Sequence, residues 1–176
     1  MKNNFFNNLG IASVERIHSQ MIAWIFNEDF LSSKKKSLIL NSLFGLNKDY
    51  KDFQALTEYK NIDILIKADN DVFIFENKIK IGHHDNQLEN YRDVIDKDEI
   101  FFANKPKFTY LSLIGDDPYL SDWQSIKYQD LLLVFKKAKF KNSSEFNKLA
   151  FNEYIHCLED LISVFNKFNN NHQGFL

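Results

Sequence analysis

Two short hydrophobic runs separated by a polar break form the clearest pattern in the chain. The runs cover residues 62–67 and 72–79. Both are rich in β-branched and aromatic side chains, which favour strands. The break contains Asp69 and Asn70, two residues that tolerate turn geometry. The pattern therefore predicts an antiparallel hairpin.

The register of this hairpin places two acids opposite each other. A loop centred between Asp69 and Asn70 makes Asp63 face Glu76 across the two strands. Side chains alternate between the two faces of a strand, so Lys78 shares the face of Glu76. We therefore expect two carboxylates and one amine to lie together on one face of the sheet.

Two like charges that face each other destabilise a hairpin, so the pattern makes best sense if a divalent cation lies between Asp63 and Glu76. Mg²⁺ prefers oxygen ligands, binds one or two carboxylates and leaves positions for water and substrate phosphates. The pattern therefore indicates phosphate chemistry. An ordinary surface patch, in which Lys78 pairs with either acid, is the alternative interpretation.

Other elements follow from apolar spacing and from the residues that begin or end helices. Ser13 as N-cap and Glu15 in the first turn predict a helix over residues 14–27. Gly45 is expected to end a second helix. In chain order we also expect a helix at 34–44, a strand at 53–59, a helix capped by Asp85 and running to about Asp96, a strand at 108–114, a loop at 116–123, and helices at 128–139 and 144–168.

The order of helix, three strands, helix and strand predicts an α/β core with extra helices at both ends. We expect a single domain over residues 1–168 and a flexible tail at 169–176. The last helix carries an apolar stripe, expected to form core or a dimer face: Phe146, Ala150, Tyr154, Leu158, Leu161, Ile162, Phe165 and Phe168.

Composition adds limits to this picture. The chain has 176 residues, 44% of them hydrophobic, and a net charge of −2, which argues against broad adhesion to nucleic acid but leaves room for a local basic groove. Lysines at 34–36 and 136–141 are candidates, with solvated helix faces as the simpler interpretation. A single cysteine, Cys157, and the lack of a long apolar run predict a cytoplasmic protein without membrane contact.

Several short motifs, taken together, carry a family resemblance. Asp63, the Glu76-Asn77-Lys78 phrase and the Gln87-to-Tyr91 helix occur in the order of the PD-(D/E)XK nuclease superfamily, whose core is αβββαβ and restriction-endonuclease-like. The chain resembles the RecB-like branch and, through the stretch from Glu15 to Ser19, an uncharacterised bacterial subgroup. The resemblance spans roughly residues 13–131. It implies a role in bacterial defence or DNA processing.

The resemblance also implies roles for individual residues. Asp63 and Glu76 would bind the metal, with the backbone carbonyl of Asn77. Lys78 would orient the attacking water or stabilise charge on phosphorus. The residue before Asp63 is Ile62, where the name-giving motif has proline.

Two further elements contribute residues under this resemblance. Glu15, on the first helix, would reach the metal directly or through water. Gln87 and Tyr91 lie four residues apart on one helical face and would border the site. The implied cofactor is Mg²⁺, which Mn²⁺ is expected to replace.

Nearby histidines and one acid have weaker claims. His18 shares a helix face with Glu15, and either a phosphate contact or a structural role fits it. His83 and His84 follow the hairpin, where a DNA contact or a solvated loop fits. Glu58 would point to the opposite face from Asp63 if its strand ran unbroken, so it is left out of the predicted site.

The sequence therefore favours an Mg²⁺-dependent nuclease that hydrolyses phosphodiester bonds of DNA. One alternative is a catalytically inactive module that binds nucleic acid or supports assembly on the same fold. Another is an interaction subunit that uses the C-terminal helices, either as a homodimer or with a larger protein partner.

Overall fold

The structure is a computed structural model, which describes residues 4–80, 87–96, 106–138 and 143–172. Five strands and six helices occur in these ranges. In chain order they are α1 (Phe5–Asn8), α2 (Glu15–Asn27), α3 (Ser33–Phe44), β1 (Phe53–Tyr59), β2 (Ile62–Ala68), β3 (Asp71–Lys78), α4 (Gln87–Asp96), β4 (Lys107–Ser112), β5 (Trp123–Lys127), α5 (Tyr128–Lys137) and α6 (Glu145–His172).

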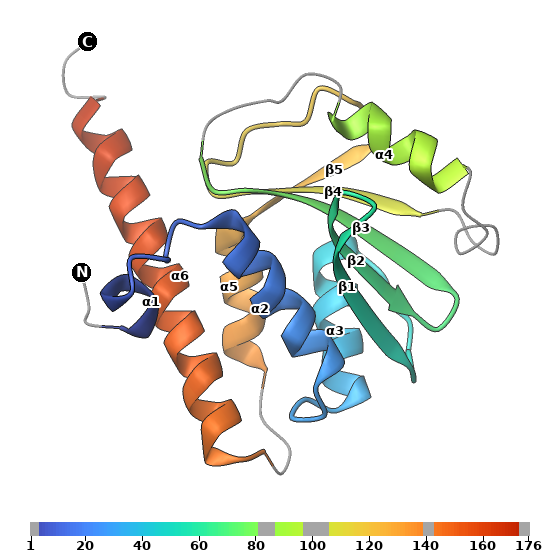
Figure 1. Ribbon diagram of the computed structural model, residues 1–176, viewed down its shortest axis with the longest axis horizontal. Helices are drawn as coiled ribbons and strands as arrows, with labels where there is room; N and C mark the ends of the chain where they lie inside the picture. Colours follow the sequence, from blue (N-terminus) through green and yellow to red (C-terminus); the bar gives the residue numbers. More distant parts are fainter. Residues whose placement is uncertain (1–3, 81–86, 97–105, 139–142, 173–176) are drawn as a thin grey trace.

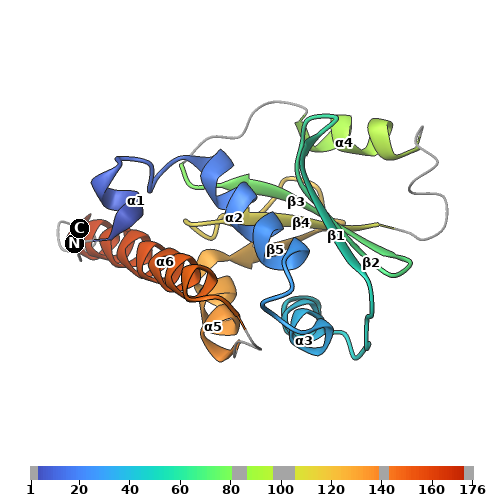
Figure 2. The ribbon, with the colours of Figure 1, turned by 60° about the horizontal axis from the view of Figure 1, so that its bottom comes forward.

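The strands form one mixed sheet in the order β1-β2-β3-β4-β5. The first three strands are antiparallel, whereas β3, β4 and β5 run parallel to one another. Figures 1 and 2 show α4 over one face of the sheet and the other long helices on the opposite side. This arrangement confirms the predicted restriction-endonuclease-like α/β fold, in which a mixed sheet is covered on both faces.

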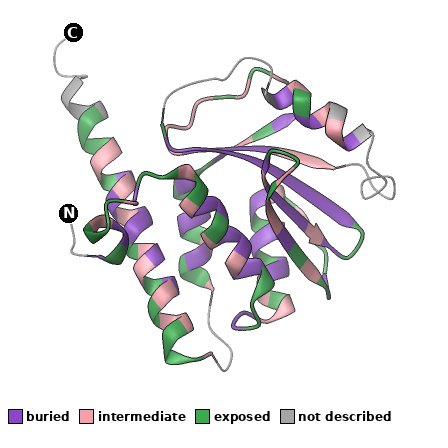
Figure 3. Cartoon of the chain, viewed as in Figure 1, coloured by how far each residue is buried: buried purple, intermediate pink, exposed green. Residues whose placement is uncertain are grey.

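Two hydrophobic clusters hold these layers together. The larger one joins the sheet to α2, α3, α5 and α6, and it includes the fully buried Phe26, Phe73 and Phe135. The smaller one lies under α4, where Leu88 and Ile95 join apolar residues of the sheet. Figure 3 shows that β3 is buried along its length, because both of its faces are covered.

The central hairpin has the predicted register. Ala68 pairs with Asp71 across a two-residue turn, and the ladder continues to the pair of Ile64 and Phe75. Asp69 has a φ of 49°, consistent with the turn geometry that aspartate tolerates. One further step along the same register would bring Asp63 opposite Glu76.

Several predicted boundaries were wrong for physical reasons. Val14, not Ser13, is the N-cap of α2, and it makes no side-chain capping bond. The short strand β5 was missed because Trp123 and Ile126 are spaced by three residues and do not show strand alternation. Gly45 does end α3, with a φ of 62°.

The last helix differs in part from its predicted apolar stripe. Tyr154, Leu158 and Ile162 are buried as expected, but Phe146 and Phe168 are 72% and 64% exposed. They lie near the two ends of α6, beyond the part of the helix that the core covers. The helix continues to His172, into the segment predicted as a tail, while the domain limits stay a prediction.

Within the described ranges, no helix has the length and apolar content needed to cross a bilayer.

The short α1 is held against α6 by polar contacts, since the side-chain amides of Asn4 and Asn7 donate hydrogen bonds to Asp160 at 3.0 and 2.8 Å. These contacts bring the N-terminal segment to the same side of the molecule as α6.

Candidate active site

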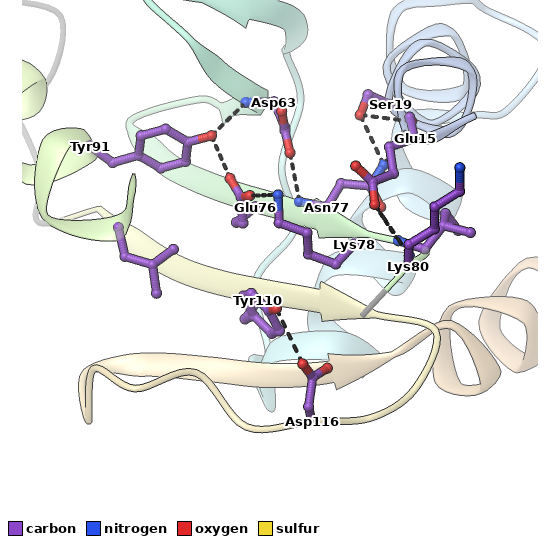
Figure 4. Close-up of polar contacts among 12 residues, drawn as sticks. Glu15, Ser19, Asp63, Glu76, Asn77, Lys78, Lys80, Tyr91, Tyr110 and Asp116 are labelled. Carbon is purple, nitrogen blue, oxygen red and sulfur yellow. Dashed lines mark hydrogen bonds and ion pairs between the residues drawn. The ribbon is translucent and has the colours of Figure 1, made fainter. Parts of the chain in front are cut away.

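The candidate site lies where β2 and β3 separate. The ladder of paired residues between the strands stops at Ile64 and Phe75. Beyond that pair, the backbone N–H of Asn77 donates to the Oδ2 atom of Asp63 at 2.8 Å, so a carboxylate takes a position that a strand carbonyl would otherwise hold. The side chains of Asp63, Glu76 and Lys78 lie between the strand ends at this point (Figure 4).

Four of the predicted residues lie together around the buried carboxylate of Glu76: Asp63, Glu76, Lys78 and Tyr91. Glu76 is fully buried. Its Oε2 atom accepts a hydrogen bond from the Tyr91 hydroxyl at 2.5 Å, and its Oε1 atom lies 2.5 Å from the Lys78 ammonium nitrogen. The Tyr91 hydroxyl also accepts the N–H of Asp63 at 3.3 Å. Tyr91 therefore bridges the two acidic positions (Figure 4).

The charge on Asp63 is costly in this position. Burial, followed by the nearby charge of Glu76, raises the pKa of Asp63 from 3.8 to about 7. The Asn77 N–H and the Lys78 charge oppose this shift but do not cancel it. A cation placed beside Asp63 and Glu76 would therefore stabilise the ionised form of both acids.

Lys78 remains a cation although it is buried. Burial by itself lowers its pKa, but the hydrogen bond and the charge of Glu76, followed by the charges of Glu15 and Asp63, raise the pKa above its ordinary value. A buried ammonium group in contact with a carboxylate can stabilise negative charge that develops next to it.

Glu15 lies at the edge of this group and contacts the backbone. Its Oε1 atom accepts the N–H groups of Ile79 at 2.9 Å and Lys80 at 3.3 Å, which fixes the exit of β3 against the first turn of α2 (Figure 4). Across the described ranges, no three His, Cys, Asp or Glu side chains converge as a preformed metal cluster. Glu15 thus lies near the site, and its role as a metal ligand, directly or through water, stays a prediction.

Asn77 connects three elements through its buried side chain. Its Nδ2 group donates to the Glu15 carbonyl at 2.9 Å and to Ser19 Oγ at 3.0 Å, and its Oδ1 atom accepts the Tyr128 hydroxyl at 2.6 Å. The N–H and C=O of a strand residue point to the same neighbour. Because the Asn77 N–H meets Asp63, its carbonyl lies on that side as well.

The remaining predicted residues have different outcomes. Gln87 begins α4, but its side chain lies outside the described part of the structure, as do His83 and His84. His18 is fully buried, with Nε2 2.9 Å from the Ala12 carbonyl and Nδ1 3.2 Å from the Tyr154 hydroxyl. Burial lowers the pKa of His18 to about 4. His18 is therefore a neutral structural residue.

Glu58 is a residue that strand alternation wrongly removed from the neighbourhood. The pairs of Thr57 with Ile64 and of Tyr59 with Ile62 keep one register on both sides of Glu58, so Glu58 lies opposite Asp63 on the neighbouring strand and not farther along the same strand. The charge of Glu58 contributes to the raised pKa of Asp63, which places the two acids near each other. The adjacent Lys60 and Asn61 have positive φ and form the turn into β2. The available signal in the sequence was this turn, because asparagine tolerates positive φ.

Asp116 was also missed, because it lies in a loop that carries no motif. It accepts hydrogen bonds from the hydroxyls of Ser112 and Tyr110, the latter at 3.4 Å. Burial, then Asp116, and then the more distant charges of Glu76 and Glu15 raise the pKa of Tyr110. Figure 4 shows this pair on the side of Lys78 away from Asp63.

The donor set fits a divalent cation. Asp63 and Glu76 supply carboxylate oxygens, and Asn77 can supply a carbonyl oxygen, which are the ligand types that Mg²⁺ and Mn²⁺ accept. The Oδ1 atom of Asp63 accepts no hydrogen bond from any residue that the structure describes. Burial and then the charge of Glu76 raise the pKa of Asp63, and the charge of Lys78 does not cancel that shift.

Comparison with known proteins agrees with this geometry. The model of a family described as the PD-(D/E)XK nuclease superfamily matches residues 3–176. Neither the curated proteins nor the solved structures contain a significant match. The family match covers nearly the whole chain, including every residue of the candidate site. The chain therefore belongs to the PD-(D/E)XK nuclease superfamily.

Proposed function

We propose that this protein is an Mg²⁺-dependent nuclease that hydrolyses phosphodiester bonds of DNA. The observation that carries the proposal is the convergence of Asp63, Glu76 and Lys78 at the separated ends of β2 and β3. Family membership supports a metal-dependent nuclease. The choice of DNA and of Mg²⁺ is part of the proposal.

Asp63, Glu76 and the Asn77 carbonyl would hold the cation, and Mn²⁺ should replace Mg²⁺ there. When bound, such an ion lowers the pKa of a water ligand and offsets charge on the phosphoryl oxygens. The backbone contact of Asn77 with Asp63 fixes one carboxylate oxygen and directs the other away from the strand. The Tyr91 hydroxyl similarly orients Glu76.

Lys78 would act on the substrate side of the site. An ammonium group has three N–H donors, so its contact with Glu76 does not exhaust its capacity to bind a phosphoryl oxygen or to orient the attacking water. Glu15 would act through water or through the backbone it holds, and Gln87 would border the site from α4. Both roles remain predictions.

A nuclease assay tests the proposal. Purified protein is incubated with Mg²⁺ or Mn²⁺ and with single-stranded, double-stranded, nicked and branched DNA and with RNA. We expect cleavage of at least one DNA substrate, and its loss in Asp63→Asn, Glu76→Gln and Lys78→Met. Lys167→Gln, at an exposed position on α6, is the matched control. Failure to cut every substrate with either metal would refute the proposal.

A catalytically inactive module that binds nucleic acid or supports assembly is the alternative. The presence of Asp63, Glu76 and Lys78 together favours the enzyme, because a module that only binds nucleic acid has no need for two acids that repel phosphate. A gel shift without cleavage, unaffected by removal of metal, would favour the alternative.

Self-association through the C-terminal helices also stays a prediction. An apolar pocket of about 670 Å³ lies between α1, α2 and α6, and Phe146 and Leu149 are exposed beside it. Sedimentation of the full chain would report a homodimer directly. A role in bacterial defence or DNA processing is proposed from the resemblance alone, and a cytoplasmic location from the single cysteine and the lack of a long apolar run.

A further inference from the structure

The polar row that contains Lys78 continues across the sheet. Parallel pairing places Ser112 beside Lys78, and Lys127 beside Ser112. Neighbours in register have side chains on the same face of a sheet. Lys127 therefore lies on the face of Lys78, two strands away and roughly 10 Å distant between Cα atoms, given about 4.8 Å between strands.

A tight turn after β4 holds the stem of Lys127. Ser112 Oγ accepts the N–H groups of Ile114 at 3.2 Å and Gly115 at 3.1 Å, and it donates to Asp116. Gly115 has a φ of 77°, and a Cβ atom added there would lie 2.7 Å from Cε of Lys127. The left-handed backbone favours glycine here, and without a Cβ atom the turn leaves room for the aliphatic part of Lys127 to pack over it.

The ammonium end of Lys127 is available to a ligand. The residue is exposed, and in the described ranges it forms no ion pair with an acid. By contrast, several other lysines are paired with carboxylates: Lys48, Lys51, Lys107, Lys136 and Lys148. A lysine whose stem packs over a turn and whose charge has no such acid partner can turn its ammonium group towards a phosphate.

The surroundings explain why a second cation is needed on this face. A polyanionic strand that approaches this site is repelled by its acids. These acids are Glu15, Glu58, Asp63, Glu76 and Asp116. Lys78 contacts Glu76 directly, so part of its charge is already offset. A cation farther along the row would offset repulsion at a neighbouring phosphate.

We propose that Lys127 binds a backbone phosphate of the substrate strand, next to the phosphate that Lys78 serves. This inference rests on the proposed nuclease function and adds the direction in which the strand crosses the site, from β3 towards β5. The phosphate contact is assigned to the ammonium group and not to the N-terminus of α5, because Asp130 in the first turn already accepts the Lys127 N–H at 3.3 Å.

The test measures binding of a fluorescein-labelled DNA by anisotropy between 50 and 200 mM NaCl, with Ca²⁺ in place of Mg²⁺. We expect Lys127→Gln to weaken binding several-fold and to reduce the slope of log affinity against log salt by about one contact. Lys127→Arg should retain the slope. Lys167→Gln removes the same charge from an exposed position on α6 and should match the wild type. An unchanged slope in Lys127→Gln would overturn the inference.

Steady-state cleavage with Mn²⁺ separates this inference from the nuclease proposal. Lys127→Gln should raise KM several-fold with little change in kcat, and Mn²⁺ affinity should stay that of the wild type. A wild-type enzyme that cuts DNA, with identical KM in Lys127→Gln, would overturn only the inference. Binding that depends on Lys127, without any cleavage, would support the inference and refute the nuclease. If the protein shows neither DNA binding nor cleavage, both the inference and the nuclease proposal are refuted.

Discussion

At the scale of single residues, the site is built at the expense of stability. Asp63 is held beside Glu76 and is partly removed from water, so its ionised form is disfavoured unless a cation is bound. Its contact with the Asn77 N–H and its place at the strand separation fix its orientation nonetheless. The cost of holding the Asp63 carboxylate in this orientation can be measured as a change in protein stability, without substrate.

Asp63→Asn should stabilise the metal-free protein at neutral and alkaline pH. The pKa of Asp63 is about 7 in the folded state and 3.8 in the unfolded state, so its contribution is fully present below pH 3.8 and lost as pH rises through 7. The difference corresponds to at most about 4 kcal/mol. Urea unfolding in EDTA at pH 5 and pH 8 should show the wild type losing stability relative to the variant. A difference independent of pH would contradict this account.

Tyr91→Phe should weaken both the fold and the metal site. The change leaves Glu76 Oε2 and the Asp63 N–H without their hydroxyl partner, which costs about 1–3 kcal/mol. Loss of an orienting partner typically lowers metal affinity about 10-fold or more. Urea unfolding and Mn²⁺ titration measure the two effects. Tyr119→Phe, which removes an exposed hydroxyl bound to Glu89, should change neither by a comparable amount.

At the scale of elements, β3 is the centre of the molecule. Its Asn77 side chain joins α2 and α5, while Glu76 and Lys78 face the site on the α4 side. Alternation along one strand thus separates a structural residue from two functional ones. The Glu76-Asn77-Lys78 motif therefore contributes to both the fold and the site.

Asn77→Ala should therefore destabilise the protein strongly. It removes three side-chain hydrogen bonds and leaves the buried Tyr128 hydroxyl without its Asn77 partner, so we expect a loss of about 2–4 kcal/mol in the free energy of unfolding. Gln124→Ala removes one bond to the Leu43 carbonyl and should cost about 1 kcal/mol or less. Equal losses in urea unfolding would show that Asn77 is not the junction described.

The elements also show where sequence prediction succeeds. The hairpin and its register follow from two β-branched runs and an Asp-Asn turn, because local pattern and tertiary position agree there. β5 has no comparable pattern and is held by pairing with β4. Glu58 shows a second limit, since the turn between β1 and β2 places it opposite Asp63, which counting along a single strand does not reveal. Asp116 lies in a loop without a motif, and only the folded position of that loop beside Ser112 brings it near the site.

At the scale of the whole molecule, α2 links the site to the helical layer. His18 lies on α2 one turn from Glu15, but its ring packs against Tyr128 and Tyr154 of α5 and α6. The sequence could place His18 on the face of Glu15. It could not show that α6 covers the ring, because that contact joins residues 136 positions apart.

His18 should make the fold sensitive to acid. Its pKa is lowered from 6.5 to about 4, so the folded state resists protonation and stability falls as pH decreases from about 6.5 to 4. The shift corresponds to about 3 kcal/mol. Over this range Asp63 acts with the opposite sign. The stability difference between wild type and His18→Gln in urea should therefore shrink on acidification, and a constant difference would exclude the buried neutral histidine.

The central claim is that Asp63 and Glu76 bind a divalent cation beside Lys78. Isothermal titration of the metal-free chain with Mn²⁺ tests it most directly, with circular dichroism to verify folding. We predict saturable binding in the wild type and in Lys167→Gln, and loss of that binding in Asp63→Asn and Glu76→Gln. Undiminished Mn²⁺ binding in both folded variants, or none in the wild type, would contradict the account.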